Sequence, residues 1–387
     1  MSKTVNGPYN IVRLEGDVGG KKKIIYLFSD IHVFEDECDD IDSLDINKYL
    51  LKVFRKAKKK IPDITYDFFV EAYTRPEAEY IDNQKRSNYL LLVRKMFYHL
   101  NRKKRILSNE MNIRLHYTDF RDYLGTYQLH TTILNAIGET DIMFSHSSLH
   151  SGNINNIITT IAPLTDLIKY TQYLINAVLK KIDIKDRSVY FTPGNVTQKQ
   201  SSDILNNIFE KIRNNYSNKM IKSTLVKILS GLNPMLKSIM DKYNSLLEIL
   251  NSLQKIYVPP YPTFNIDKQE SLKTITDIKQ RLIDINTSTL QVGVILIDIF
   301  MLRRFLDKDY ITNAIYYCGG FHANFIATTL IQYFDFKITH IAKSDISVDE
   351  LNKQLKTADI YNAHSMEKLF KPSYQCSSLE GFPDLLT

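Results

Sequence analysis

The chain has 387 residues, of which 44% are hydrophobic and 24% charged, with a formal net charge of +7, as in an ordinary globular protein of one large or two modest domains. Three cysteines, Cys38, Cys318 and Cys376, are too few and too scattered for a disulfide framework or a CxxC metal site, which favours a reducing compartment. No apolar stretch follows the N-terminal charge and no 18 apolar residues run together, so we expect no signal peptide, no membrane span and a cytoplasmic location.

Short apolar runs alternate with helical patterns on both sides of the middle of the chain. Most of the runs are continuously apolar, as in strands buried on both faces of a parallel sheet. We expect strands at 23–28, 66–73, 112–117, 141–145, 188–192, 314–318 and 337–342. Apolar residues at helical spacing predict helices within 45–60 and 88–105. This alternation predicts an α/β fold with a mainly parallel central sheet flanked by helices.

The middle of the chain differs from both ends. Residues 198–309 carry almost no strand signal, and their helical periodicity is broken by the Pro/aromatic stretch at 257–264. We therefore expect a discontinuous sheet domain over 1–198 and 291–387. A mostly helical insertion or cap would occupy residues 199–290.

Ionisable residues follow several of the expected strands at their carboxyl ends, where open parallel sheets bind ligands. They are Asp30, His32, Glu71, Asp119, Arg121 and His322. Each histidine taken singly is more often a hydrogen-bonded structural residue. Two imidazoles with two or more carboxylates suit a divalent metal with an open position, or general acid–base chemistry without a metal. Gly319 and Gly320 would let the backbone approach a ligand closely, at a helix N-terminus that attracts anions.

Three of these segments resemble a known superfamily. Residues 29–32 (SDIH), Glu71 and residues 319–322 (GGFH) resemble the GxxH…E…GxxH motifs of the TIKI/TraB, erythromycin-esterase and ChaN-like superfamily, which has divergent members in large DNA viruses. The resemblance implies hydrolysis of an ester or amide at His32, Glu71 and His322. These residues would hold Mn, Fe, Co or Zn, or a catalytic water, with no nucleotide cofactor. Ser29 stands where the motif usually has Gly.

The remaining polar residues receive supporting roles on this interpretation. We expect Asp30 and Asp119 to act as outer or general-base carboxylates, and Arg121 to polarise a carbonyl or hold an anion. Residues 298–305 (DIFMLRRF) resemble the helix before the last motif of such viral proteins, which makes Asp298 and Arg304 lesser candidates. The substrate itself is not predicted.

Other functions stay open. A calcineurin-like metallophosphoesterase would use residues 28–32 (FSDIH), but no GDxxD motif exists and Val196 replaces the histidine expected after Gly194-Asn195. Nucleophilic catalysis by Cys318 or Ser29 lacks a GxSxG elbow. A non-catalytic viral structural or host-interaction protein on a relic hydrolase scaffold is the third alternative, located in host cytoplasm or virion.

Basic clusters and a histidine pair complete the candidates. Lys21–Lys23, Arg55–Lys60 and Arg102–Arg105 would contact phosphate or nucleic acid, or would simply be solvated helix ends. His146 and His150 have the i, i+4 spacing of a shared metal, although a polar loop leading into a helix explains them as well.

Overall fold

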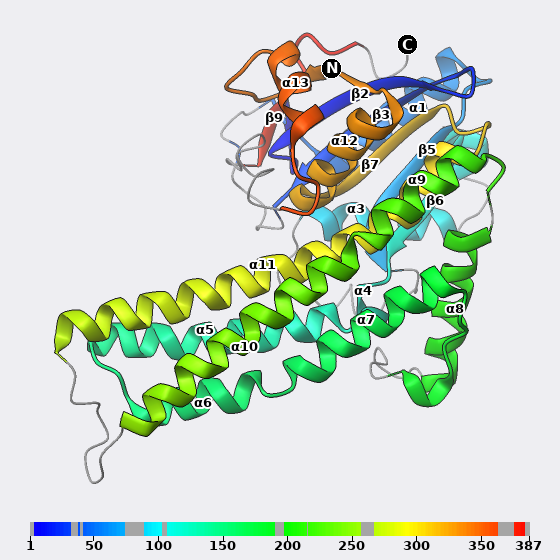
Figure 1. The fold of residues 1–387 in the computed structure, drawn as a ribbon. Coiled ribbons are helices and arrows are strands. Elements are labelled where there is room, and N and C mark those ends of the chain that lie inside the picture. Colours follow the sequence, from blue (N-terminus) through cyan, green and yellow to red (C-terminus); the bar gives the residue numbers. More distant parts are fainter. Residues whose placement is uncertain are drawn as a thin grey trace. The chain divides into compact units, whose positions relative to one another are not determined.

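The computed structural model describes residues 4–31, 38, 42–73, 89–102, 107–189, 197–214, 216–256, 267–362 and 375–383. The chain divides into two compact units (Figure 1). Residues Met1–Phe120, Tyr216–Thr224 and Ile297–Thr387 form the sheet unit, and Arg121–Asn215 and Leu225–Leu296 form the helical unit. The α/β class expected from the sequence is confirmed.

The helical unit is built from long amphipathic helices. Its described elements are α4 (Arg121–Leu124), α5 (Thr126–His146), α6 (Ser151–Ile161), α7 (Leu164–Lys180), the short η2 (Asp186–Ser188), α8 (Gln198–Asn214), α10 (Leu232–Ile256), and parts of α9 (Lys219–Ser230) and α11 (Lys268–Asp307). Ile154, Ile157 and Ile161 recur at helical spacing on α6 and are fully buried. The buried Tyr243 hydroxyl of α10 donates to the Ile161 carbonyl at 3.1 Å, which joins these two helices.

One predicted strand is wrong. Residues 141–145 are the last turns of α5, which runs unbroken from Thr126 to His146. Met143 is buried, whereas Ile142 and Phe144 are about half exposed, so the apolar run does not form one continuous buried strand. A short apolar run does not distinguish strand from helix, and here the longer helical pattern decides.

In the sheet unit, the described strands form a six-stranded sheet in the order β6-β5-β7-β3-β2-β8. Their bounds are β2 (Asn10–Val18), β3 (Lys21–Asp30), β5 (Tyr66–Tyr73), β6 (Ile113–Asp119), β7 (Asn313–Gly319) and β8 (Lys337–Ile341). Strands β6, β5, β7 and β3 are parallel to one another, and β2 is antiparallel to both β3 and β8. The carboxyl ends of the four parallel strands therefore share one edge of the sheet.

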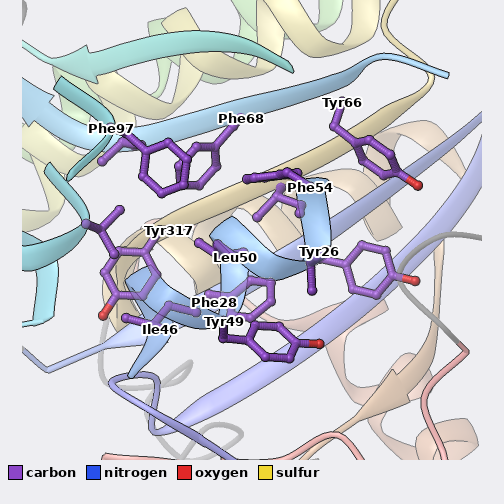
Figure 2. Packing of buried hydrophobic residues seen from close by; sticks show 14 of the residues in the cluster. Tyr26, Phe28, Ile46, Tyr49, Leu50, Phe54, Tyr66, Phe68, Phe97 and Tyr317 are labelled. Carbon is purple, nitrogen blue, oxygen red and sulfur yellow. The ribbon is translucent and has the colours of Figure 1, made fainter. Parts of the chain in front are cut away.

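Helices cover the sheet on two faces. On the first, which we call the α1 face, α1 (Ile46–Lys60) and α3 (Tyr89–Arg102) pack on Phe28, Phe68 and Tyr317 (Figure 2). Side chains alternate along a strand, so Tyr316 faces the opposite way, where its ring meets His322 of α12 (Gly320–Phe334). We call this second side the α12 face. The bounds of the other described elements are η1 (Leu107–Met111) and α13 (Val348–Thr357).

The core on the α1 face is aromatic. Phe54 of α1 is fully buried, and its ring lies 5.5 Å from that of Phe68 and 5.9 Å from that of Phe97 (Figure 2). Burying one such side chain stabilises the fold by roughly 1.5–3 kcal/mol, and tilted ring pairs add to this. The aromatic cluster joins α1 and α3 to the middle strands and so fixes the strand ends that lie beyond it.

Part of the predicted basic surface is structural. Lys23 is fully buried, and its ammonium donates to the carbonyls of Phe305, Lys308 and Ile311 at 2.7–2.9 Å, at the C-terminus of α11. Burial lowers the pKa of Lys23 to about 8, so the side chain remains charged at neutral pH. Lys23 is thus not available to a surface phosphate. Lys58–Lys60 form the last turn of α1, where cations balance the helix dipole, and residues 103–105 lie outside the described residues.

Helix α11 is long and apolar enough to cross a membrane by length and composition. Among the described residues, one helix meets this test. In α11, 72% of the most apolar 18-residue segment is buried inside the protein. The core helix of a folded domain meets the same test, and the burial of α11 fits that explanation.

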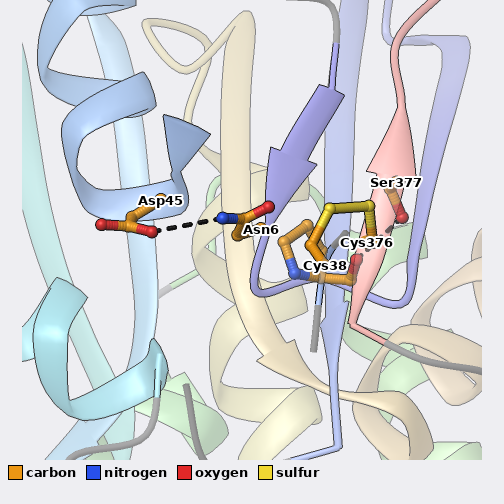
Figure 3. Close-up of a disulfide and its surroundings, with 6 residues drawn as sticks. Asn6, Cys38, Asp45, Cys376 and Ser377 are labelled. Atoms are coloured by element: carbon orange, nitrogen blue, oxygen red, sulfur yellow. Dashed lines mark hydrogen bonds between the residues drawn. A yellow bond between two sulfur atoms is a disulfide. The ribbon is translucent and has the colours of Figure 1, made fainter. Parts of the chain in front are cut away.

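The two ends of the chain meet in a small sheet with the order β4-β1-β9. Here β1 (Thr4–Asn6) pairs with β4 (Leu44–Asp45) and with β9 (Cys376–Ser378). Cys38 and Cys376 are joined by a disulfide beside this sheet (Figure 3). Three cysteines are too few for a disulfide framework, but this one pair, which the sequence did not predict, joins residues 338 positions apart.

Candidate functional site

The candidate site lies at the carboxyl edge of the parallel strands. The chain leaves β3 and β5 toward helices on the α1 face, but it leaves the intervening β7 toward α12 on the other face. Such a reversal between neighbouring strands opens a crevice beyond the strand ends, which is where open α/β sheets bind ligands. Asp30, Glu71 and Gly319 stand at the ends of these three strands.

Glu71 is fixed at the end of β5. The pairing of β5 with β7 ends at Val70 and Tyr317, and the Glu71 carboxylate then accepts the Gly319 N–H at 2.6 Å. Gly319 caps the N-terminus of α12, so Glu71 supplies the anion that this helix end favours. The helix N-terminus expected to bind a ligand anion is thus already in contact with a protein carboxylate, which is buried with 2% exposure.

His322 lies between two buried carboxylates. Its Nδ1 is 2.8 Å from Asp298 Oδ1 on α11, a hydrogen bond that orients the ring. Its Nε2 is 3.3 Å from Glu71 Oε1, but the pair lacks the alignment of a hydrogen bond. The chain Asp298–His322–Glu71 therefore crosses from α11 through α12 to β5, entirely within the sheet unit.

The protonation of His322 follows from its burial and from the two carboxylates beside it. Burial opposes the charged imidazole, but the carboxylates of Asp298 and Glu71 outweigh it and raise the pKa of His322 to about 10. The ring is then an imidazolium at neutral pH in the protein alone. Burial, with Glu71, Asp298 and Asp30 nearby, raises the pKa of the Cys318 thiol well above its usual range, so Cys318 is not a nucleophile there.

Asp30 occupies a separate polar cluster on the α1 face. The Tyr317 hydroxyl donates to its Oδ2 at 2.9 Å, and Gln375 Nε2 donates to its Oδ1. Gln375 Nε2 also donates to the Gly7 carbonyl at 2.6 Å. Asp30 is opposite Gly319 in the β3–β7 register, so the two clusters adjoin through Gly319 and lie on different faces of the sheet.

The structure describes some of the other candidate residues and not others. His32 lies outside the described residues, as does the segment 190–196 with Gly194 and Asn195. Asp119 is buried at the end of β6, in register with Tyr73, and Arg121 begins α4 in the helical unit. His146 ends α5, and His150 caps α6.

Gly320 has a packing role that the sequence did not predict. A Cβ at this position would lie 2.3 Å from the Tyr9 hydroxyl oxygen and 3.2 Å from its ring carbon Cζ. The space that we expected a ligand to use is filled by Tyr9, which is buried. Gly320 therefore allows Tyr9 to close the start of α12.

The spacing of two described side chains can be compared with that of ligands in a zinc site. Zinc bonds of about 2.0–2.1 Å in a tetrahedral site place neighbouring ligand atoms about 3.3 Å apart. The Nε2–Oε1 separation of His322 and Glu71 is 3.3 Å, and Asp298 on Nδ1 is the outer carboxylate usual for a metal-bound histidine. Among the described residues, no group of three His, Cys, Asp or Glu side chains could hold a metal, and His32 is not among them.

Comparisons with known proteins identify relatives from a giant virus. Residues 3–387 match DUF5847, a family of unknown function. The chain is 31% identical to "Uncharacterized protein R161" of Acanthamoeba polyphaga mimivirus, with 98% of this chain and 97% of that protein covered. It is also 31% identical to "Uncharacterized protein R706" of the same virus, with 99% and 96% covered. No solved structure matches this chain.

Proposed function

Since the chain belongs to the DUF5847 family, a family of unknown function, and is similar to giant-virus proteins, we propose its activity from the site itself: metal-dependent hydrolysis of an ester or amide bond. The observation that carries this proposal is the 3.3 Å separation of His322 Nε2 and Glu71 Oε1, without a hydrogen bond between them. The resemblance of residues 29–32, Glu71 and residues 319–322 to the TIKI/TraB, erythromycin-esterase and ChaN-like motifs supports the same reaction class.

Each residue of the buried chain has a part in this proposal. His322 and Glu71 would hold the ion, with His32 as the third ligand that the resemblance implies. Asp298 keeps the Nδ1 proton of His322 in place, so that Nε2 faces Glu71. The Gly319 N–H fixes the second oxygen of Glu71 and leaves Oε1 toward the imidazole. A bound divalent ion supplies Lewis-acid activation of a water molecule at neutral pH.

The carboxylates at this edge of the sheet indicate which type of substrate the site would accept. Glu71, Asp298, Asp30 and Asp119 are all buried there, within one sheet unit. Concentrated negative charge repels anionic substrates, which disfavours a phosphate ester, and tolerates neutral or cationic ones. We therefore propose a neutral ester or amide and not a phosphoester.

The test is the metal content of the purified protein, followed by assays with p-nitrophenyl esters and peptide amides. We expect near-stoichiometric Zn, Mn, Fe or Co in the wild type and loss of the metal in His322→Ala and Glu71→Gln. His340→Ala, which removes a half-buried histidine from β8, is the matched control and should retain the metal. A folded wild type that stays metal-free after incubation with each ion overturns the metal role and leaves metal-free acid–base chemistry at His322 and Glu71.

A further inference from the structure

Gln375 reaches the site from the far end of the chain. Its side chain is fully buried, and its amide joins Asp30 to the Gly7 carbonyl. The backbone carbonyl of Gln375 accepts the Gly7 N–H at 3.0 Å. The side chain and backbone of Gln375 thus hold both sides of Gly7 and one oxygen of Asp30.

The residue after Gln375 is covalently tied. Cys376 opens β9 and is disulfide-bonded to Cys38, which follows the carboxyl end of β3 in the sequence (Figure 3). Beyond the disulfide, the described contacts that hold β9 include three register pairs with β1 and the Ser377 hydroxyl on the Pro8 carbonyl. A strand this short has little stability of its own, so a covalent link is a large part of what keeps it in place.

We propose that Gln375 is a positioning residue for Asp30, and that the Cys38–Cys376 disulfide places this contact under thiol–disulfide control. Oxidised protein keeps Gln375 on Asp30. When a dithiol reductant transfers two electrons and two protons, the S–S bond breaks, both cysteines become thiols, and the reductant becomes a disulfide. Strand β9 then keeps only non-covalent contacts, namely its pairing with β1, the Ser377 hydroxyl on the Pro8 carbonyl and the Gln375–Gly7 hydrogen bonds, and Gln375 leaves Asp30.

Loss of the Gln375–Asp30 contact affects the site because β3 and β7 are paired in the sheet. Asp30 is opposite Gly319, and the Gly319 N–H fixes Glu71. A shift of Asp30 would therefore move Gly319 and the Glu71 oxygen that its N–H holds, and would weaken metal binding indirectly. This part of the inference rests on the proposed metal site, whereas the release of β9 does not.

The experiment compares oxidised and dithiothreitol-treated full-length protein by hydrogen exchange and by titration with Co²⁺, whose visible spectrum reports on the geometry of its ligands. Reduction should speed exchange at residues 376–378 about tenfold or more. It should also weaken Co²⁺ binding and change the cobalt spectrum. Gln375→Ala should change the spectrum without reductant. Cys38→Ser and Cys376→Ser should behave as reduced protein and should not respond to dithiothreitol.

Two results overturn the inference. One is unchanged exchange in β9 and at Asp30 after mass spectrometry of alkylated protein has shown that the bond was reduced. The other is alkylation of Cys38 and Cys376 in protein that was never reduced. Protein that binds no Co²⁺ in either state while β9 is released counts against the proposed metal site alone, because exchange does not depend on the metal.

Discussion

The two ends of strand β5 carry buried carboxylate–histidine pairs with opposite properties. At the amino end, Asp67 is 2.7 Å from His116 Nε2 and also accepts two hydrogen bonds from Arg114. Burial and the nearby Arg304 and Arg114 lower the pKa of His116, although Asp67 opposes them. At the carboxyl end, two carboxylates raise the pKa of His322 to about 10.

The difference lies in how each carboxylate is balanced. Asp67 has a guanidinium and an imidazole, so its cluster is complete and its chemistry is that of a structural ion pair. Glu71 and Asp298 both contact the His322 imidazole, and together they favour its charged form. The two ends of β5 therefore differ in the direction in which the histidine pKa moves, down at His116 and up at His322.

The largest expected effect is on metal binding, which should depend on the carboxyl end of β5 and not on its amino end. Glu71→Gln should weaken metal binding by about 100-fold or more, and Asp298→Asn by about 10- to 100-fold. Asp67→Asn, the same type of change at the other end of β5, should leave metal binding unchanged. Isothermal titration with Zn²⁺ measures all three, and an equal loss in Asp67→Asn would remove the distinction.

The second prediction concerns stability. Asp67→Ala should lower the free energy of unfolding by about 3 kcal/mol, because Arg114 and His116 lose their shared partner in a buried setting. Urea denaturation monitored by circular dichroism gives the value. His340→Ala on β8 is the comparison for removing a polar side chain from an outer strand, and an unfolding midpoint for Asp67→Ala equal to that of wild type would contradict the expectation.

The third prediction concerns the entrance to α12. Gly320→Ala should cost about 1–3 kcal/mol, because its Cβ collides with Tyr9, and the added change Tyr9→Phe should restore part of this loss. Gly138→Ala on α5 is the control, since nothing lies near its Cβ, and it should gain about 0.5–1 kcal/mol. Thermal unfolding of the wild type and the three variants checks the pattern, and a Tyr9→Phe change without rescue would count against the contact.

The smallest expected effect is the acid dependence of Asp67. Burial raises its pKa, but the hydrogen bonds from Arg114 and His116 outweigh burial and lower it. The native carboxylate therefore binds fewer protons than the unfolded one, so its stabilisation is complete above the ordinary pKa of 3.8 and is lost as the pH falls through the lowered value. Unfolding measured between pH 2 and 6 should show a shallower acid loss in Asp67→Asn than in wild type.

Much of the fold could be predicted because its central strands are continuously apolar. Strands β3, β5 and β7 and helices α1, α3 and α12 agree with the predicted segments. Strand β2 was missed, since Arg13, Glu15 and Asp17 interrupt its apolar pattern. Arg13 is buried because its guanidinium donates to Tyr26, Thr339 and Glu15. The sequence contains no local signal for such pairing.

The candidate site was predicted in part for the same reason. Glu71 lies near the end of the apolar strand β5, and His322 follows the apolar strand β7 in the first turn of α12, so both positions were visible in the sequence. Asp298 was only a lesser candidate, through the resemblance of residues 298–305, and its contact with His322 from within an apolar helix is seen only in the structure. Gln375 has no recognisable motif, and its distance of 345 residues from Asp30 hides their contact. That Asp30 and Glu71 lie on different faces follows from alternation along strands, which the prediction of one shared edge left out.

Strand β7 has a consequence for how the protein is made. It fills the gap between β3 and β5, yet it is synthesised after the whole helical unit, at residues 313–319. On a ribosome, β3 and β5 would emerge early with exposed edges and wait for their shared neighbour, a state prone to aggregation. The Glu71–His322 pair forms only after β7 and α12 have been translated, so shorter nascent chains cannot hydrolyse anything by the proposed route.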